Sequence, residues 1–547
     1  FNMQEKMSYN LADVFELAVD TYPKREYLVA DHKRCTFEEM EARANRLAHH
    51  LQSQGVQPGD HVGIYAYNCM EWVETLWAVF KIRAVWININ FRYVEDELAY
   101  IFTNANLTAL VVAREFLPRV VNVIDSLPAL HHTVVIEDHS NASSDGIHIA
   151  DYETAMAANS PERDFPPRSG DDHYIIYTGG TTGMPKGVVW RQEDVFFALG
   201  GGVDQTTGDV VTSPMEVVKR GESGQMTMFP LAPLMHGASQ WAVIGRGFEG
   251  HRVVLSRTFD PVETWELIER EKINGLFITG DAMARPLIEA YKSFETEIDV
   301  SSFFLLASSA VVFSQVVKDE FFDTFHNVMI IDSIGSSEIG GGGILMASRG
   351  QIMKGGPTVK PGQGATVLDM DTLEALKPGS KKEGVVARTG FIPLGYYNDA
   401  VKTAETFVTA ADGKRYALSG DSAIFEADGT ITMLGRGSQC INSGGEKIFS
   451  EEVDSAVKGH PDILDVTVIG VPDERWGAAV CALVELRESA VLPSLKDIQD
   501  HCRKTIAGYK VPRHVLQVAK VIRSPSGKPD YRWAKTTAFK QLNVSEK

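Results

Sequence analysis

The chain has 547 residues, a length that predicts two or more domains. Of these residues 44% are hydrophobic and 23% charged, a composition typical of globular proteins. Its formal net charge of −19 argues against binding to nucleic acid or to an anionic membrane surface, because both need clustered lysines and arginines. The 5 cysteines are odd in number and widely spaced, so neither a disulfide framework nor a zinc site is expected. No apolar run approaches the roughly 20 residues of a membrane span, and the polar opening of the chain is unlike a signal peptide, so we expect a cytoplasmic location.

The first 170 residues alternate between helical and strand-like patterns. Thr36-Phe-Glu-Glu39 is typical of a capping box, and it begins a predicted helix that ends before Gly55. Residues 61–66 and 85–89 are predicted strands, and residues 70–84 are a predicted helix between them. Strands that alternate with helices predict a parallel sheet covered on both faces. We therefore expect an α/β fold, with Trp72 and Trp77 in its core.

A glycine-rich loop follows the strand-like run that ends at Tyr177. The segment Thr178-Gly-Gly-Thr-Thr-Gly-Met-Pro-Lys-Gly187 combines glycines, threonine hydroxyls and one lysine. Glycines let backbone N–H groups approach an anion, while hydroxyls and an ammonium add donors and charge, so the loop indicates a phosphate site. Lys186 lies between Pro185 and Gly187, which excludes a P-loop, because that motif needs Gly, Lys and then Ser or Thr in succession. A glycine-rich surface turn is the alternative.

This loop closely resembles the signature loop of the adenylate-forming superfamily, which includes acyl-CoA synthetases, luciferases and peptide-synthetase adenylation domains. The resemblance implies a large N-terminal domain of mixed sheets covered by helices, residues 1–435, and a small mobile C-terminal α/β domain, residues 436–547. It also implies that ATP and Mg²⁺ are bound at the loop. The residues implied in ATP binding are Thr178, Gly179, Gly180, Thr181, Thr182, Gly183 and Lys186. A homodimer is expected by analogy, since dimers are common in the superfamily.

A weakly patterned insertion precedes two segments that are candidates for an acid-binding pocket. Residues 200–225 form a weakly patterned insertion, which predicts a surface loop or, alternatively, a mobile lid. His236 ends an apolar run beside Gly237; a lone histidine is usually structural, but the resemblance implies that it flanks the acyl pocket, with residues 238–241 along the wall. Gly280 and Asp281 stand at a strand-to-helix junction that borders this pocket in the superfamily, although Asp281 alone is typical of a helix cap.

Two further apolar runs end in small polar residues, at residues 305–310 and 331–340. Loops of this kind at the carboxyl edge of a sheet suit a planar base. The resemblance implies nucleotide contacts for Ser308, Ser309, Ala310, Asp332, Ser333, Ile334, Gly335, Ser336 and Ser337. It assigns magnesium to Glu338 and Thr178, because a hard cation between phosphates takes carboxylate or hydroxyl oxygens. Ile334 replaces the aromatic residue that is usual there, which removes a stacking partner for adenine.

The predicted domain boundary follows a candidate ribose site. Asp421, in a Ser-Gly-Asp turn, matches the acid that holds the ribose in the superfamily, and a carboxylate can accept from two neighbouring hydroxyls. An ordinary turn aspartate is the alternative. Arg436 resembles the superfamily's nucleotide-contacting arginine. Ser438 occupies the hinge position, where Asp or Lys is usual, and a small residue beside glycine can still absorb a backbone rotation.

The C-terminal residues add two motifs. Ser443, Gly444, Gly445 and Glu446 resemble the loop that lies along the pantetheine tunnel in acyl-CoA synthetases, which implies CoA binding. Lys528, in a Pro/Gly turn, matches the lysine that the small domain inserts into the active site, where its ammonium bridges the attacking carboxylate and the α-phosphate. A solvated turn lysine is the alternative. The resemblance thus implies four catalytic residues: Lys528, Lys186, Glu338 and Thr178.

Together these ordered motifs imply an acyl-CoA synthetase with two half-reactions. A carboxylate attacks the α-phosphate of ATP to give an acyl adenylate and pyrophosphate; the small domain then rotates, and the CoA thiol displaces AMP. Both nucleophiles come from substrates, so the enzyme supplies position and charge. A peptide-synthetase domain would carry an acidic residue near His236, and a non-catalytic homologue would not need this set of charged residues.

Several sequence motifs indicate which carboxylic acid is the substrate. Asn90-Phe-Arg-Tyr-Val-Glu95 and Gly527-Lys-Pro-Asp-Tyr-Arg-Trp533 resemble CoA ligases that activate the carboxylated side chains of sterols. A steroid acid needs a wide apolar pocket, and the small residues from Gly340 to Gly343 could provide room. The alternative is a medium- or long-chain fatty acyl-CoA synthetase with the same mechanism.

Overall fold

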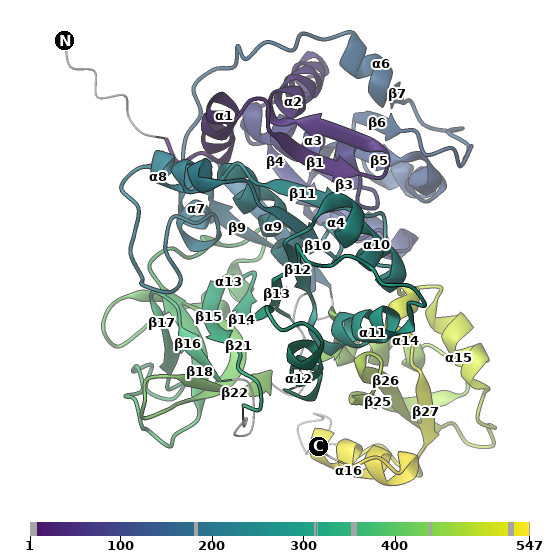
Figure 1. Cartoon of the computed structure of the whole chain (residues 1–547). Coiled ribbons are helices and arrows are strands. Elements are labelled where there is room, and N and C mark those ends of the chain that lie inside the picture. Colours follow the sequence, from purple (N-terminus) through teal and green to yellow (C-terminus); the bar gives the residue numbers. More distant parts are fainter. Residues whose placement is uncertain are drawn as a thin grey trace.

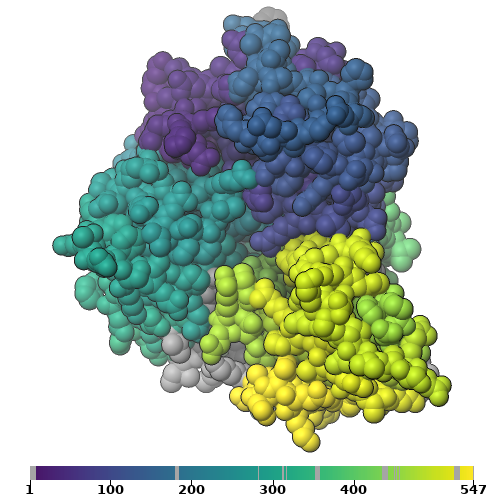
Figure 2. Space-filling view, turned by 90° about the vertical axis from the view of Figure 1, so that its right-hand side faces the viewer, coloured from purple at the N-terminus to yellow at the C-terminus, as the bar shows by residue number. Residues whose placement is uncertain are grey.

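The structure is a computed structural model that describes residues 8–179, 184–310, 313, 315–351, 358–436, 440–522 and 530–545. Its C-terminal part, yellow in Figures 1 and 2, lies at the end of the molecule opposite the purple N-terminal helices. Figure 2 shows this part packed against the blue surface formed by N-terminal residues. None of the helices in the described ranges has the length and hydropathy needed to cross a bilayer.

A five-stranded parallel sheet forms the N-terminal part, in the order β4-β3-β5-β6-β7. Its strands are β3 (His61–Tyr65), β4 (Val85–Asn88), β5 (Leu107–Ala113), β6 (His132–Ile136) and β7 (Ala150–Asp151). The helices of this part are α2 (Phe37–Ser53), α3 (Met70–Lys81), α4 (Glu95–Asn104), α5 (Leu117–Val121) and α6 (Tyr152–Ala157), with the 3₁₀ turns η1 (Arg114–Phe116) and η2 (Ile124–Ser126). Thr36 caps α2 in the predicted capping box. Trp72 and Trp77 are buried, as predicted.

A 14-stranded mixed sheet runs through the middle of the molecule. From one edge its order is β17-β18-β21-β22-β16-β15-β14-β13-β12-β10-β11-β1-β2, and β20 pairs with β21. The strands are β1 (Glu26–Ala30), β2 (Lys33–Thr36), β10 (Thr227–Pro230), β11 (Arg252–Leu255), β12 (Gly275–Ile278), β13 (Leu305–Ser308), β14 (Met329–Ser336), β15 (Gly340–Met346), β16 (Thr358–Pro361), β17 (Ala365–Leu368), β18 (Gly384–Thr389), β20 (Phe407–Thr409), β21 (Arg415–Phe425) and β22 (Ile431–Arg436). From β1 to β14 the neighbouring strands are parallel, so their carboxyl ends share one edge.

A third sheet, β19-β9-β8, carries the glycine-rich loop. It consists of β8 (His173–Gly179), β9 (Pro185–Arg191) and β19 (Gly395–Tyr396). The remaining helical segments of the N-terminal part are α1 (Leu11–Thr21), α7 (Gln192–Leu199), α8 (Pro214–Lys219), η3 (Arg220–Ser223), α9 (Gly237–Phe248), α10 (Pro261–Glu271), α11 (Gly280–Ser293), α12 (Gln315–Thr324) and α13 (Ala400–Thr406). The combination of mixed sheets and covering helices confirms the predicted fold class.

The C-terminal part is a smaller α/β unit. It contains β23 (Cys440–Ser443), β24 (Glu446–Phe449), α14 (Ser450–Lys458), β25 (Ile463–Asp473), β26 (Gly477–Leu486), α15 (Leu495–Cys502), η4 (Gly508–Lys510), β27 (His514–Gln517) and α16 (Tyr531–Leu542). Val468, Val480 and Ile498 belong to a hydrophobic core of its own. A separate core is what a small domain needs to move as one body.

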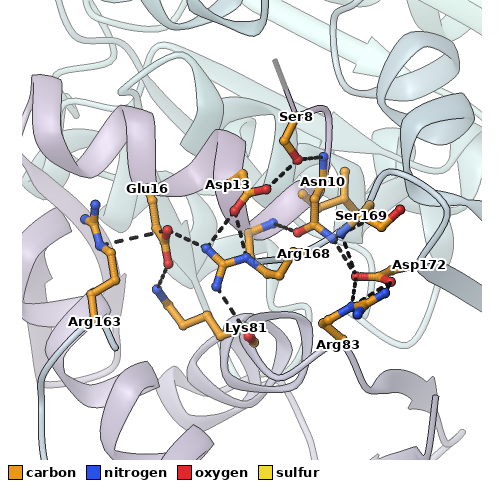
Figure 3. A network of polar contacts seen from close by, with 12 residues as sticks. Ser8, Asn10, Asp13, Glu16, Lys81, Arg83, Arg163, Arg168, Ser169 and Asp172 are labelled. Atoms are coloured by element: carbon orange, nitrogen blue, oxygen red, sulfur yellow. Dashed lines mark hydrogen bonds and ion pairs between the residues drawn. The ribbon is translucent and has the colours of Figure 1, made fainter. Parts of the chain in front are cut away.

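A buried polar network fixes the segment that leads into β8 (Figure 3). Lys81 on α3 is fully buried and donates to Glu16 on α1 at 2.6 Å and to Glu41 on α2 at 2.9 Å. Arg168 donates to Asp13 at 2.7 Å, and Arg83 forms an ion pair with Asp172 at 2.8 Å, directly before β8. The network therefore holds the start of the loop-bearing hairpin against α1 and α3.

We expect Lys81→Met to destabilise the protein by about 3 kcal/mol, because it leaves buried carboxylates without one of their cations. The free energy of unfolding in urea measures this effect. Lys24→Met is the matched control, since Lys24 pairs with Glu38 at the surface and its side chain is 82% exposed. Equal stability of the two variants would contradict the structural role given to Lys81.

Candidate active site

A cavity of ≈ 980 Å³ lies where the sheets of the N-terminal part meet the C-terminal part. Residues far apart in the sequence line it together. The predicted site residues among them are Thr178, His236, Gly237, Ser309, Ala310, Ser333, Ile334, Gly335, Ser336, Ser337, Gly340, Gly444, Gly445 and Glu446. The fold thus brings most of the predicted nucleotide, acid and CoA segments to one place.

The glycine-rich loop connects two paired strands. Thr178 pairs with Lys186 and Gly179 with Pro185, so β8 continues two residues beyond the predicted end at Tyr177. Asn88, at the end of β4, accepts from the Tyr177 N–H at 2.9 Å and donates to its carbonyl at 3.0 Å. The same amide donates to the carbonyl of Met235 at 2.8 Å, directly before His236. Asn88 therefore positions the hairpin and the predicted acyl segment relative to each other. Gly180, Thr181, Thr182 and Gly183 lie outside the described residues.

Two residues that the sequence did not single out hold the predicted catalytic groups. Lys186 forms an ion pair with Asp399, the N-cap of α13, and this contact lowers the pKa of the Asp399 carboxyl. The Tyr396 hydroxyl donates to Glu338 at 2.9 Å. Both partners lie in the run Tyr-Tyr-Asn-Asp, residues 396–399. This polar run is the sequence feature that could have indicated them.

The carboxyl ends of β13 and β14 form one wall of the cavity. Ser308 is fully buried, and its hydroxyl accepts from the Gly280 N–H at 3.0 Å. Asp332 forms a buried ion pair with Lys318 at 3.0 Å. Ser308 and Asp332 thus support the wall from behind, while Ser309, Ala310 and residues 333–337 face the cavity.

The hydroxyl of Ser336 is suited to a ligand. Its oxygen is buried in the cavity wall and makes no hydrogen bond with the described part of the chain. A buried hydroxyl without a partner costs free energy, so a bound polar group would stabilise this site. This observation fits a nucleotide at the ends of β13 and β14.

The predicted ribose site lies on neighbouring strands. Asp421 on β21 is paired in register with Arg436 on β22, and its N–H donates to the Ser419 hydroxyl at 3.0 Å. The side chain of Arg436, as well as Ser438 and Lys528, lies outside the described structure. The roles of these residues remain predictions.

Helix α9 begins at the predicted acyl segment, and His236 is its N-cap. The His236 imidazole lies 3.0 Å from a carboxylate oxygen of Glu446 in the C-terminal part. Helix α11, at the adjacent junction, has Thr279 as its N-cap, so the predicted cap role of Asp281 is wrong. Asp281 is instead the second residue of that helix, because the chain is already helical at Gly280.

The turn between β23 and β24 enters the cavity. Gly445 has φ +86°, and a Cβ at this residue would lie 3.2 Å from the Thr279 hydroxyl. Glycine therefore allows this close approach to the N-terminal part. Ser443, which ends β23, pairs in register with Glu446. Burial opposes ionisation of Glu446, but its contacts with the His236 imidazole and the Arg92 guanidinium hold the pKa of its carboxyl below the usual value.

A second group of contacts joins the N-terminal part to the C-terminal part. Lys510 donates to Glu97 on α4 at 2.6 Å, and both side chains are 3% exposed. Asn90 donates to the Tyr509 hydroxyl at 3.3 Å, and Arg92 forms an ion pair with Glu446 at 3.1 Å. These contacts were not predicted from the sequence, although Asn90 and Arg92 belong to the motif Asn90-Phe-Arg-Tyr-Val-Glu95.

Most of the chain matches one enzyme family. Residues 15–397 match the model of the AMP-binding enzyme family, and residues 452–528 match that of the AMP-binding enzyme C-terminal domain. The chain belongs to this family, as the resemblance of its motifs predicted.

Two relatives cover nearly the whole chain. A 3-oxocholest-4-en-26-oate–CoA ligase of Rhodococcus rhodochrous is 50% identical over 534 residues, which is 97% of this chain and 96% of the relative. A medium/long-chain-fatty-acid–CoA/3-oxocholest-4-en-26-oate–CoA ligase of Mycolicibacterium smegmatis is 48% identical over 533 residues, with the same coverage of 97% and 96%.

Solved structures show the same fold. An amide bond synthetase from Marinactinospora thermotolerans superposes with a TM-score of 0.78 at 21% identity, covering 96% of this chain and 99% of that one. An o-succinylbenzoate CoA synthetase from Bacillus subtilis, bound with its product analogue, has a TM-score of 0.76 at 20% identity, covering 96% and 98%.

Proposed function

We propose that the protein is an acyl-CoA synthetase that activates a steroid side-chain carboxylic acid with ATP and transfers the acyl group to CoA, releasing pyrophosphate and AMP. The observation that carries this proposal is the 50% identity, over 97% of the chain, to a ligase of a steroid side-chain acid. Medium- or long-chain fatty acids are the second candidate substrates, because the relative that is 48% identical acts on both classes. A cytoplasmic location and a homodimer remain part of the proposal.

In the first half-reaction, the acid's carboxylate attacks the α-phosphate of ATP. Thr178 and Glu338 would hold magnesium, which supplies charge neutralisation at the phosphates when it is bound. Lys186 would exchange its contact with Asp399 for a phosphate oxygen, and Lys528 would align the carboxylate with the α-phosphate. Asp421 and Arg436 would hold the ribose, and Ser336 would supply a hydrogen bond to the nucleotide.

In the second half-reaction, the CoA thiol attacks the acyl carbonyl and AMP leaves. The turn from Ser443 to Glu446 would line the thiol's path, and its contact with His236 would set the distance between this turn and the acyl group. The two half-reactions need different groups at one cavity, so we propose that residues 436–547 rotate between them about Ser438.

The test is AMP release with ATP, magnesium and CoA across acetate, hexanoate, palmitate and steroid side-chain acids, with each acyl-CoA identified by mass. We expect the highest kcat/KM with a steroid acid. A preference for palmitate would support the second candidate, and no turnover with any acid would favour a non-catalytic nucleotide-binding protein.

The Lys510–Glu97 ion pair should affect the second half-reaction more than the first. Removal of one partner from a buried pair is strongly destabilising, and this pair joins the two parts when the Ser443–Glu446 turn occupies the cavity. We therefore expect Lys510→Met to slow thioester formation from added acyl adenylate at least about ten-fold. Pyrophosphate release without CoA should change much less.

The double variant Glu97→Gln/Lys510→Met is the matched control. It removes both charges, so no buried ion remains without its partner, and thioester formation should recover in part. Equal losses in both half-reactions would show that the pair supports general stability instead of one arrangement of the two parts.

A further inference from the structure

One face of α9 follows the cavity along its whole length. Gly237, Trp241 and Gly245 line the cavity at intervals of four residues, and Glu249, the C-cap, continues this row. Residues four apart lie on the same side of a helix. The helix has 12 residues, so the row extends about 18 Å at ~1.5 Å per residue. The cavity is therefore long, with two distinct ends.

The end near His236 is the reaction end, because Glu446 of the C-terminal turn contacts His236 and Asn88 joins Tyr177, directly before Thr178, to Met235. The substrate carboxyl group must lie there to reach both the nucleotide and the thiol. Along the row, Gly245 leaves space: outside α9 itself, a Cβ at this residue would have only the Leu199 carbonyl near it, at 3.9 Å. A long acid that enters with its carboxyl group at His236 extends toward Glu249.

The far end of the cavity is charged. Arg246 forms an ion pair with Glu249 at 2.9 Å, and Arg220 lies 3.6 Å from the other oxygen of the same carboxylate. All three residues line the cavity. The Glu249 side chain is 9% exposed, but Arg220 and Arg246 remain 37% and 38% exposed. Two guanidinium groups carry more N–H donors than one carboxylate accepts, so donors remain for a ligand.

We propose, on the basis of the function proposed above, that Arg246 and Arg220 bind a ring ketone oxygen at the end of the acid farthest from its carboxyl group. A ketone oxygen accepts hydrogen bonds and cannot donate them, whereas a guanidinium only donates. The bond is charge-assisted and so stronger than one between neutral groups. A linear fatty acid has no acceptor at this end and gains nothing from the two arginines. They therefore select keto-steroid acids over other acids of similar length.

The test compares two steroid side-chain acids that differ only in the presence of the ring ketone. For each enzyme, the ratio of kcat/KM for the keto acid to that for the deoxy acid is measured. Because both rates come from one preparation, this ratio does not depend on how much of the protein is folded. We expect a ratio of about ten or more for the unsubstituted enzyme and a ratio near one for Arg246→Met.

Arg220→Met should lower the ratio in the same direction, and Arg246→Lys should retain part of it, since lysine keeps a charged donor. Arg503→Met is the matched control, because Arg503 forms an ion pair with Asp500 in the C-terminal part and does not line the cavity. A ketone preference that is absent from the unsubstituted enzyme, or unchanged in both methionine variants, overturns the proposal. Failure of the unsubstituted enzyme to form any acyl-CoA would instead refute the proposed function.

Discussion

Gly245→Leu is expected to lower kcat/KM for palmitate and for steroid side-chain acids on the order of 100-fold, while hexanoate changes about two-fold or less. Gly245 lies on the face of α9 that lines the cavity, between Trp241 and Glu249. A leucine side chain there would project into the cavity between Trp241 and Glu249 and narrow it at that point. Acids that extend beyond Trp241 would then clash, whereas a short acid remains near His236.

The helix itself should tolerate this change. Gly245 lies inside α9, where leucine has a higher helix propensity than glycine by roughly 0.8 kcal/mol, so the Tm should not fall. Gly245→Ala is the control, since its Cβ meets no atom closer than 3.9 Å, and its substrate range should resemble that of the unsubstituted enzyme. Equal losses with short and long acids would show that the acid does not lie along α9.

Lys528→Ala is expected to lower pyrophosphate release, measured with acid and ATP but without CoA, on the order of 100- to 1,000-fold. The ammonium group would bridge the carboxylate and the α-phosphate, and alanine supplies no charge there. Thioester formation from added acyl adenylate should fall far less, because that step no longer needs the bridge.

Lys520→Ala is the matched control, since Lys520 is an exposed lysine shortly before Lys528 in the chain. It should leave both half-reactions unchanged. If Lys528→Ala also left adenylation unchanged, the lysine would be an ordinary solvated turn residue, which is the alternative noted from the sequence.

Local signals predicted much of the fold. The capping box at Thr36 and the buried tryptophans of α3 depend on residues within a few turns of each other, and the structure confirms them. The predicted end of α3 was less accurate, because the helix ends at Lys81 instead of Ala84. Arg83 adopts φ +60°, and its guanidinium pairs with Asp172, 89 residues away. A contact over such a distance cannot be read from helical periodicity.

The candidate site shows the same contrast between local motifs, which could be predicted, and long-range contacts, which could not. Motifs that line the cavity with backbone groups or small side chains, such as the ends of β13 and β14, could be predicted because each is a short unbroken stretch of sequence. The partners that hold charged residues could not, because they depend on tertiary contacts. Lys186 pairs with Asp399, 213 residues away, and Glu97 with Lys510, 413 residues away. Asn88, which joins the hairpin to the His236 turn, lies inside the predicted strand of residues 85–89, and the strand pattern indicates no such contact.

Transfer of ¹⁸O from a labelled acid tests the central claim most directly. A 3-keto steroid acid with ¹⁸O in both carboxyl oxygens is incubated with the enzyme, ATP, magnesium and CoA, and AMP and the acyl-CoA are analysed by mass. Attack of the carboxylate on the α-phosphate predicts one ¹⁸O atom in the phosphate of AMP and one in the thioester carbonyl. Steroid acyl-CoA formed together with unlabelled AMP would contradict the adenylate mechanism, and labelled AMP from palmitate but not from the steroid acid would contradict the proposed substrate.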